Sequence, residues 1–237
     1  MSVFKFLNIR SLQEEIMDDF SCDGEVVDQT LRELHQINTY LGGNQISIGA
    51  MKSFLDQHPQ SEYKIVDLGC GGGDTMKLFA KWGKKNNRNL ELCGVDANEY
   101  IIEYAETNTK KYKNIAYQTA NIFGASFQSQ TFDIAHSSLF LHHFQEEEIV
   151  ELLEQLLSQV KIGIIINDLH RHWISYFFTK YLISRWSKSE MVKYDSILSV
   201  ARSFTRAELE RCLQLAKVKH YSLKWRWAFR WELIIWK

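Results

Sequence analysis

Four glycines stand between two aspartates in the stretch VDLGCGGGDT, residues 66–75, directly after an apolar run. Glycine adopts positive φ angles and lets a ligand approach the backbone closely, so a glycine-rich turn after a strand indicates a nucleotide site. The dinucleotide pattern GxGxxG fits at Gly69 and Gly71, but Asp74 occupies the position of its third glycine. The carboxylates of Asp67 and Asp74 argue against a pyrophosphate and favour a ligand that carries a positive charge.

A further carboxylate follows one strand later, at the end of the run LELCGVD. This residue, Asp96, lies at the distance from the glycine turn at which an acid accepts hydrogen bonds from ribose hydroxyls. S-adenosylmethionine combines a ribose with a sulfonium and an α-amino group and needs no phosphate. The glycine turn and Asp96 together therefore predict an S-adenosylmethionine site, and they say little about the acceptor.

Two adjacent histidines, in the motif LHHF, are placed to do acid–base chemistry. His142 and His143 follow the expected strand FDIAHSS, and Asp168 ends the neighbouring strand at the same edge of the sheet. An imidazole ionises near neutral pH, and a carboxylate beside it orients the ring and raises its basicity, as removal of a proton from a hydroxyl acceptor requires. Each histidine is a candidate general base with Asp168 as its partner. The alternative for each is a structural role, as a cap of the helix opened by QEEE or as a packing residue.

The elements that must position these residues alternate between strands and helices. Strands are expected at YKIVDLG, LELCGVD, IAYQTAN, FDIAHSS and GIIINDL, with helices from Thr75, near residues 99–108 and near residues 146–160. This alternation predicts an α/β fold with a doubly wound, mostly parallel sheet that is buried on both faces. Thr205 opens a further helix with a capping box. The alternating run HYSLKWRWAFRWELIIW predicts a hairpin that turns near residues 226–229.

Two segments outside this alternation are expected to cover the acceptor. Helices near residues 26–41 and 48–57 precede the polar stretch HPQSEY, and we place a boundary there, with residues 1–60 as an N-terminal helical lid and residues 61–237 as the main domain. Residues 171–203 are rich in aromatic side chains and are expected to form an inserted helical cap. These aromatic side chains must face the pocket, the interior of the lid or a membrane.

Composition limits the class of protein. The chain has 237 residues, 45% of them hydrophobic, and a formal charge of −1, without the basicity typical of nucleic-acid binding. Residues 11–30 hold seven acids and no base, which we interpret as a solvated face. No run of about 18 apolar residues occurs, so we expect a soluble, cytoplasmic protein without stable membrane insertion. The four cysteines have no metal-ligand spacing, and we expect reduced thiols and no metal; they are Cys22, Cys70, Cys93 and Cys212.

The combined pattern VDLGCGGGDT, GVD and FDIAHSSLFLHH resembles the class I S-adenosylmethionine-dependent methyltransferases over roughly residues 60–170. More loosely, the stretches LRELHQINTYLGGNQISI and KYDSILSVARSFTRAEL resemble bacterial methyltransferases that modify phenols, quinones and polyketides. The resemblance implies a seven-stranded Rossmann-like fold in which Asp67 fixes the glycine turn and Asp96 holds the ribose. It also implies that Asn121 replaces the usual acid at the adenine amino group. The other implied cofactor contacts are Gly69, Cys70, Gly71, Gly73, Asp74, Thr75, Ala97, Ile122, Ser137 and Ser138.

These features predict methyl transfer from S-adenosylmethionine to a hydrophobic small molecule, most simply O-methylation of a phenolic, quinol or polyketide-like acceptor. A C- or N-methyltransferase of the same fold and a non-catalytic S-adenosylmethionine-binding module remain alternatives. Methyltransferases that modify base nitrogens in RNA often carry an Asn/Asp-Pro-Pro-aromatic tetrad after the fourth strand. Pro59 is the single proline of the chain, so the tetrad is absent and we expect no nucleic-acid partner.

Overall fold

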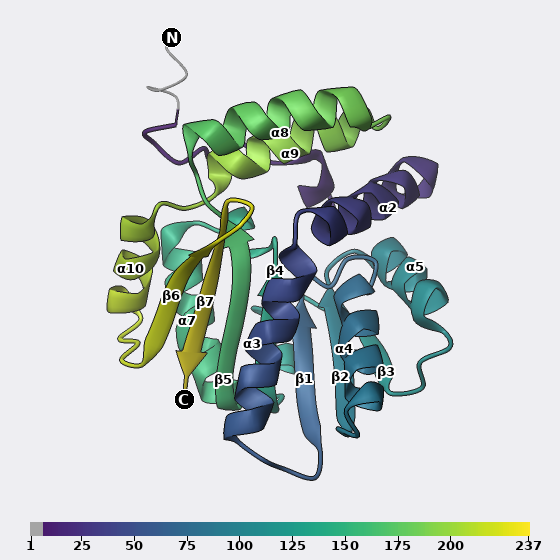
Figure 1. The fold of residues 1–237 in the computed structure, drawn as a ribbon, viewed down its shortest axis with the longest axis vertical. Coiled ribbons are helices and arrows are strands. Elements are labelled where there is room, and N and C mark those ends of the chain that lie inside the picture. Colours follow the sequence, from purple (N-terminus) through teal and green to yellow (C-terminus); the bar gives the residue numbers. More distant parts are fainter. Residues whose placement is uncertain (1–6) are drawn as a thin grey trace.

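A seven-stranded sheet with helices on both faces forms the body of the computed structural model, which describes residues 7–237 (Figure 1). The strand order is β3-β2-β1-β4-β5-β7-β6. The first five strands are parallel, whereas β7 runs antiparallel to both β5 and β6. The strands are β1 Tyr63–Leu68, β2 Leu90–Asp96, β3 Ile115–Thr119, β4 Phe132–Ser138, β5 Val160–Leu169, β6 Tyr221–Arg226 and β7 Arg230–Trp236. The predicted α/β fold, its parallel strands and the C-terminal hairpin are confirmed.

The helices of the main body fall where the sequence pattern predicts them. Thr205 accepts a hydrogen bond from the Glu208 amide and closes the expected capping box. The α-helices are α2 Gly24–Tyr40, α3 Gly43–Gln57, α4 Asp74–Lys85, α5 Glu99–Thr109, α6 Ala125–Gln128, α7 Glu146–Gln159, α8 Trp173–Trp186, α9 Glu190–Arg202 and α10 Arg206–Leu215. Two 3-10 turns are η1 Ile16–Asp18 and η2 Leu141–His143.

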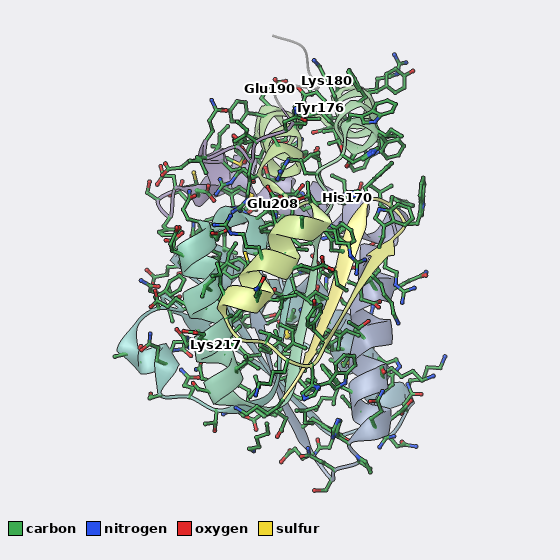
Figure 2. All side chains as sticks on the ribbon, turned by 90° about the vertical axis from the view of Figure 1, so that its left-hand side faces the viewer. His170, Tyr176, Lys180, Glu190, Glu208 and Lys217 are labelled. Atoms are coloured by element: carbon green, nitrogen blue, oxygen red, sulfur yellow. The ribbon has the colours of Figure 1, made fainter. Side chains whose placement is uncertain are left out.

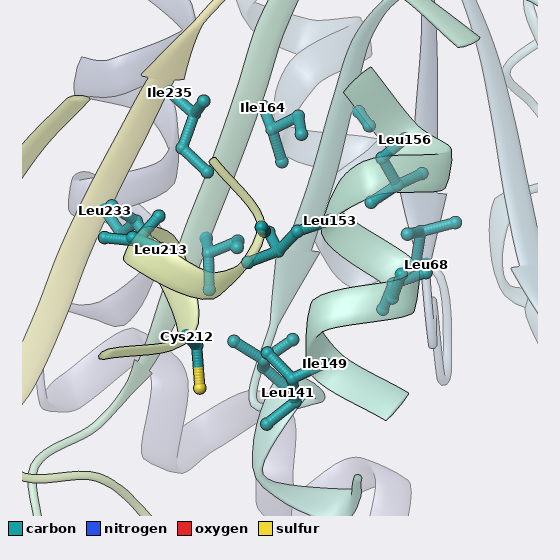
Figure 3. Packing of buried hydrophobic residues seen from close by; sticks show 14 of the residues in the cluster. Leu68, Leu141, Ile149, Leu153, Leu156, Ile164, Cys212, Leu213, Leu233 and Ile235 are labelled. Atoms are coloured by element: carbon teal, nitrogen blue, oxygen red, sulfur yellow. The ribbon is translucent and has the colours of Figure 1, made fainter. Parts of the chain in front are cut away.

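Each face of the sheet is covered by its own apolar layer. On one face α7 and α10 pack their leucines against β4, β5 and β7, as Figure 3 shows for Leu153, Leu213 and Leu233. On the other face α3 and α4 contribute a second cluster that includes Phe54 and Phe79. Strands covered on both faces must be apolar along their whole length, which is why β5 reads as a nearly continuous run of isoleucines.

The third layer lies across the carboxyl end of the sheet, where α2, α8 and α9 come together with η1 (Figure 1). The helix predicted near residues 48–57 begins at Gly43 instead. Its side chains Met51, Phe54 and Leu55 are fully buried against the sheet, so α3 packs mainly on the main body and meets the pocket in its first turn, with Asn44. A domain boundary near residue 60 stays a prediction.

The direction of strand addition reverses between β1 and β4. From β1 the chain adds β2 and β3 on one side and then β4 and β5 on the other. In an open parallel sheet this reversal leaves a crevice at the carboxyl ends of the strands, where ligands bind. The glycine turn after β1 and the histidines after β4 border this crevice. No helix in residues 7–237 combines the length and hydropathy that crossing a bilayer requires.

Candidate active site

A cavity of about 1100 Å³ occupies the crevice between the carboxyl edge of the sheet and the helices above it. Most of the residues expected in the site line this cavity: Asp67, Gly69, Cys70, Gly71, Asp74, Thr75, Asp96, Ala97, Asn121, Ile122, Ser138, His142 and His143. Gly73, Ser137 and Asp168 lie behind the lining. Gly73 is the N-cap of α4, and the side chains of Ser137 and Asp168 are buried.

The glycine turn after β1 requires glycine at two positions for different reasons. Gly69 and Gly71 have φ angles of 61° and 49°, in the left-handed region that favours glycine. A Cβ atom added at Gly69 would lie 2.1 Å from the Phe140 ring. The amide of Gly71 donates to Asp96 Oδ2 at 3.3 Å, so the turn and the end of β2 are held together. Gly69 therefore leaves room for the Phe140 ring, and Gly71 lines the cavity with backbone alone.

Asp67 is fixed by a hydrogen-bonded chain that the sequence did not reveal. Its Oδ1 lies 2.6 Å from His136 Nδ1, and His136 Nε2 lies 2.8 Å from Ser47 Oγ. Asn167 Nδ2 in turn donates to Ser47 Oγ at 3.2 Å. All four residues are buried. These hydrogen bonds connect β1, which precedes the glycine turn, to α3 and β5. They fix the position of Asp67 below the cavity.

Asp96 is arranged to accept hydrogen bonds from a ligand. Its oxygens receive backbone N–H groups from Gly71 and from Asn98, the latter at 3.1 Å. Burial raises the pKa of Asp96 and these amides oppose the shift. A carboxylate has about four acceptor positions, so positions remain for two ribose hydroxyls. Together with the bare glycine turn, this geometry fits S-adenosylmethionine.

Asp74 and Asn121 line the same cavity but are already engaged. Asp74 Oδ1 lies 2.5 Å from Lys77 Nζ and 3.4 Å from His35 Nδ1. Its charge is therefore compensated within the protein, which weakens the expectation that it selects a cationic ligand. Asn121 Oδ1 accepts the Phe123 amide at 2.9 Å in an Asx turn. One lone pair of this oxygen remains for an adenine amino group.

His142 is enclosed between two carboxylates. Its Nδ1 lies 2.7 Å from Asp168 Oδ1, as the sequence predicts, and its Nε2 lies 3.5 Å from Glu15 Oε1. Burial by itself lowers the pKa of His142, but Asp168 and Glu15 outweigh it and raise this pKa to about 9. At neutral pH the ring is therefore a charged imidazolium with both nitrogens engaged, which is unsuited to accepting a proton.

His143 has a different partner from the one expected. Its Nδ1 lies 2.5 Å from Asp18 Oδ1, and its ring stacks on His142 with centroids 4.4 Å apart. Arg202 donates to the other oxygen of Asp18 and, at 2.7 Å, to the carbonyl of His143. Burial opposes ionisation of Asp18, but His143 and Arg202 hold the pKa of this carboxyl well below its usual range. Of the two candidate histidines, His142 therefore has Asp168 as its partner and His143 has Asp18.

The acids of residues 11–30 are not all on a solvated face. Glu15 is 7% exposed, and Asp18 lies against the histidines. The turn η1 that carries both is held by Asp195 on α9, whose carboxylate accepts the amides of Ile16 and Met17 at 2.8 and 3.2 Å. No local spacing signals a contact between residues so far apart in the chain, so the sequence did not identify Glu15 and Asp18 as site residues.

Glu15, His142 and His143 also bring one donor atom each within 4.8 Å of the others. The two imidazole planes are inclined by 30° in a stacked pair. The lone pairs of two stacked imidazole rings lie in the ring planes and run side by side, so they do not converge on one metal position. Both nitrogens of His142 already face carboxylates. We therefore interpret the group as a hydrogen-bonded cluster.

The strand order, the glycine turn and the carboxylate at the end of β2 are similar to those of the class I S-adenosylmethionine-dependent methyltransferases. Residues 65–163 match the family described as methyltransferase domain. Among curated relatives, the ubiquinone biosynthesis O-methyltransferase of Coxiella burnetii (strain Dugway 5J108-111) is 26% identical over 118 residues, which cover 48% of this chain and 47% of that protein. The chain thus spans about half the length of the curated relatives that it matches.

Solved structures show the same fold. The plantazolicin methyltransferase BpumL, in complex with a triazolic desmethylPZN analog and SAH, superposes with a TM-score of 0.64 at 21% identity, covering 83% of this chain and 73% of that chain. The magnesium protoporphyrin IX methyltransferase of Synechocystis PCC 6803, with bound SAM, has a TM-score of 0.57 at 14% identity and covers 100% and 91% of the two chains. At these identities the similarity establishes the fold.

Proposed function

We propose that the protein transfers a methyl group from S-adenosylmethionine to a hydroxyl oxygen of a hydrophobic phenolic, quinol or polyketide-like molecule. The observation that carries this proposal is the pairing of His143 with Asp18 at the wall of the cavity. A histidine oriented by a carboxylate is what an oxygen acceptor needs and what a nucleophilic amine does not. The O-methyltransferase among the curated relatives supports the same assignment.

The apolar part of the cavity lining supports an apolar acceptor. The third layer and the hairpin supply large apolar side chains to this lining, beside polar residues such as Asn38, Ser175 and Ser199. Pockets that bind drug-sized ligands have this character, with a few polar groups that fix the orientation. The large apolar residues that line the cavity from the third layer and the hairpin are Leu31, Leu34, Phe178, Leu182 and Phe229.

In the proposed mechanism the protein binds S-adenosylmethionine, orients the acceptor and removes the proton of its hydroxyl group. S-adenosylmethionine, when bound, supplies an electrophilic methyl group for displacement at carbon. Asp96 holds the ribose, and the bare backbone of Gly69 and Gly71 admits the methionine moiety. With Nδ1 of His143 donating to Asp18, the neutral ring has its acceptor lone pair on Nε2, which takes the acceptor's hydroxyl proton as the oxygen attacks. Asp18 stabilises the imidazolium that forms.

His142 has a positioning role in this scheme. Its charged ring lies under His143 and is held by Asp168 from β5 and Glu15 from η1. The His142 ring packs against the ring of His143 and limits its movement. Through Glu15 it also connects η1 to the sheet, which positions Asp18 beside His143. The third layer covers the cavity. It holds the acceptor close to the methyl donor and limits the access of water to the reacting groups.

The proposal is tested by incubating the protein with methyl-labelled S-adenosylmethionine and a panel of apolar phenols, catechols and quinols, followed by mass spectrometry and NMR of the product. We expect the label on a phenolic oxygen. Label on carbon or nitrogen would identify one of the alternative methyltransferases. Tight binding of S-adenosylhomocysteine without turnover of any acceptor class would favour the binding module.

A further inference from the structure

The helix α8 places large apolar side chains on its outer surface. Only Ser175 and Ile183 of its fourteen residues are buried. Tyr181 is 70% exposed, and Trp173, Ile174 and Phe177 are each more than 40% exposed. These four side chains recur at the spacing of one helical face, and Figure 2 shows that α8, marked by Tyr176 and Lys180, lies at the end of the molecule. An apolar helix face of this kind marks an interaction site.

The exposed face continues onto the tip of the β6–β7 hairpin. Trp225 and Trp227 are 46% and 64% exposed. Both contact Phe229, with ring centroids 6.2 and 5.8 Å apart, and Phe229 contacts Phe178 of α8 at 6.1 Å. The hairpin and the helix therefore form one surface. We name it the aromatic surface and define it as Trp173, Ile174, Phe177, Tyr181, Trp225 and Trp227.

Basic residues without acidic neighbours in sequence surround this surface. Residues 171–189 contain no Asp or Glu, and Lys180, Arg185 and Lys188 are exposed there. Glu190, the first acid beyond this segment, pairs with Lys193 at 2.7 Å. Of the basic residues at the hairpin, Arg226 is neutralised by Glu232. A positive surface rich in Trp and Tyr is complementary to anionic lipid headgroups, at whose level these rings and lysine side chains are favoured.

The length of α8 is consistent with lying on a bilayer and not with crossing it. Fourteen residues span about 21 Å as an α-helix, which is less than the roughly 30 Å hydrocarbon core. The expectation of no stable membrane insertion is therefore compatible with reversible docking. An apolar face on a helix of this length, with basic side chains beside it, is typical of interfacial helices.

The same helix also forms the wall of the cavity. Phe178, Leu182 and Ile183 of α8 line the cavity, as does Phe229 of the hairpin. One helix thus separates the aromatic surface from the cavity by a single layer of side chains. An apolar acceptor dissolved in a bilayer would meet the protein at the site where it is used.

We propose that the aromatic surface docks the protein reversibly on an anionic lipid bilayer. The proposal goes beyond methyl transfer and stands on exposure, composition and charge alone. Its test needs no turnover, so its failure leaves the proposed activity untouched, and failure of that activity leaves the docking measurable.

The test is flotation of the full chain with vesicles of phosphatidylcholine, alone or mixed with phosphatidylglycerol. We expect the protein to float with the mixed vesicles, with a blue shift of tryptophan emission, and the double variant Tyr181→Ser/Trp227→Ser to bind at least about tenfold more weakly. The matched control is Tyr221→Ser, which removes a partly exposed tyrosine at the far end of β6. The double change Lys180→Glu/Arg185→Glu should weaken binding to mixed vesicles by at least about tenfold.

Circular dichroism and the melting temperature confirm that each variant is folded. Absence of wild-type binding to the mixed vesicles overturns the proposal. Equal binding of the folded double variant does the same. If vesicles are not bound and the double variant instead converts an oligomer to a monomer, the aromatic surface is an interface between copies of this chain, and lipid docking is likewise rejected.

Discussion

His143 Nδ1 lies 2.5 Å from Asp18 Oδ1, although the two residues are 125 positions apart in the chain. Asp18 is carried by η1, which Asp195 on α9 holds through two backbone amides. Arg202, at the end of the same helix, reaches both members of the pair. The candidate base thus belongs to the main body, and its partner belongs to the layer that covers the cavity.

The first prediction concerns His143 as the general base. His143→Ala should lower kcat/KM for a phenol by roughly 10²–10⁴-fold, the usual range of general-base catalysis, and should leave cofactor affinity nearly intact. Steady-state kinetics and calorimetric titration with S-adenosylhomocysteine measure the two effects. His220→Ala, which changes an exposed histidine outside the cavity, is the matched control and should behave as wild type.

A phenol that is already ionised at the assay pH provides a second readout. It needs no base, so it should recover much of the rate that His143→Ala loses with a weakly acidic phenol. Near-wild-type rates of His143→Ala on the true acceptor would contradict the assignment, and proximity and desolvation would then account for catalysis.

The second prediction distinguishes the two carboxylate partners. Asp18→Asn removes the negative charge beside His143 Nδ1 and should lower kcat of the folded protein, with some loss of stability because buried Arg202 also loses its carboxylate partner. Asp168→Asn leaves buried His142 without its main counter-charge and should destabilise the fold, by about 3–5 kcal/mol when a buried pair is broken. Chemical denaturation and kinetics on both variants test this. The reverse pattern would make Asp168 the partner of the base.

The third prediction concerns stability and pH. The folded-state pKa of His142 is raised from 6.5 to about 9, so folding favours the protonated ring. The ion pairs therefore stabilise the fold fully below pH 6.5, and this stabilisation is lost as the pH rises through 9. The difference in melting temperature between wild type and His142→Asn should shrink across that range. A difference that is constant from pH 6 to 10 would show that His142 is neutral in the folded protein.

The order of the strands and helices was predictable from the sequence because each element has its own hydrophobic periodicity or capping residues. Asp96 and the glycine turn were predictable for the same reason, since their spacing along the chain reflects one βαβ unit. His136 could not be identified, because a histidine inside an apolar strand gives no sign that Asp67 faces it across β1 and β4. Asp18 could not be predicted as a site residue, because its contact with His143 depends on the packing of η1 on α9.

The fourth prediction tests the cofactor site. Asp96→Ala should weaken S-adenosylhomocysteine binding by about 1.5–3 kcal/mol, the scale of hydrogen bonds to a charged group. Isothermal titration against wild type gives the difference, with His143→Ala as a variant of the same cavity that should bind normally. Equal affinity of Asp96→Ala would remove Asp96 from the ribose site. Preferential binding of NADH by the wild type would reject the whole cofactor assignment.

The last prediction is that the third layer moves as the site fills. Residues 24–40 and 171–203 cover the cavity and contact the main body through few elements, chiefly α2 with α3 and α9 with η2. Hydrogen exchange in both segments should slow when S-adenosylhomocysteine and an acceptor are added together, because their opening is then coupled to ligand loss. Residues 43–57 form α3, whose inner face is fully buried on the sheet, and they serve as the internal control with unchanged exchange. Equal protection with and without ligands in both covering segments would show that they are fixed scaffold, and that Asp18 is always in place beside His143.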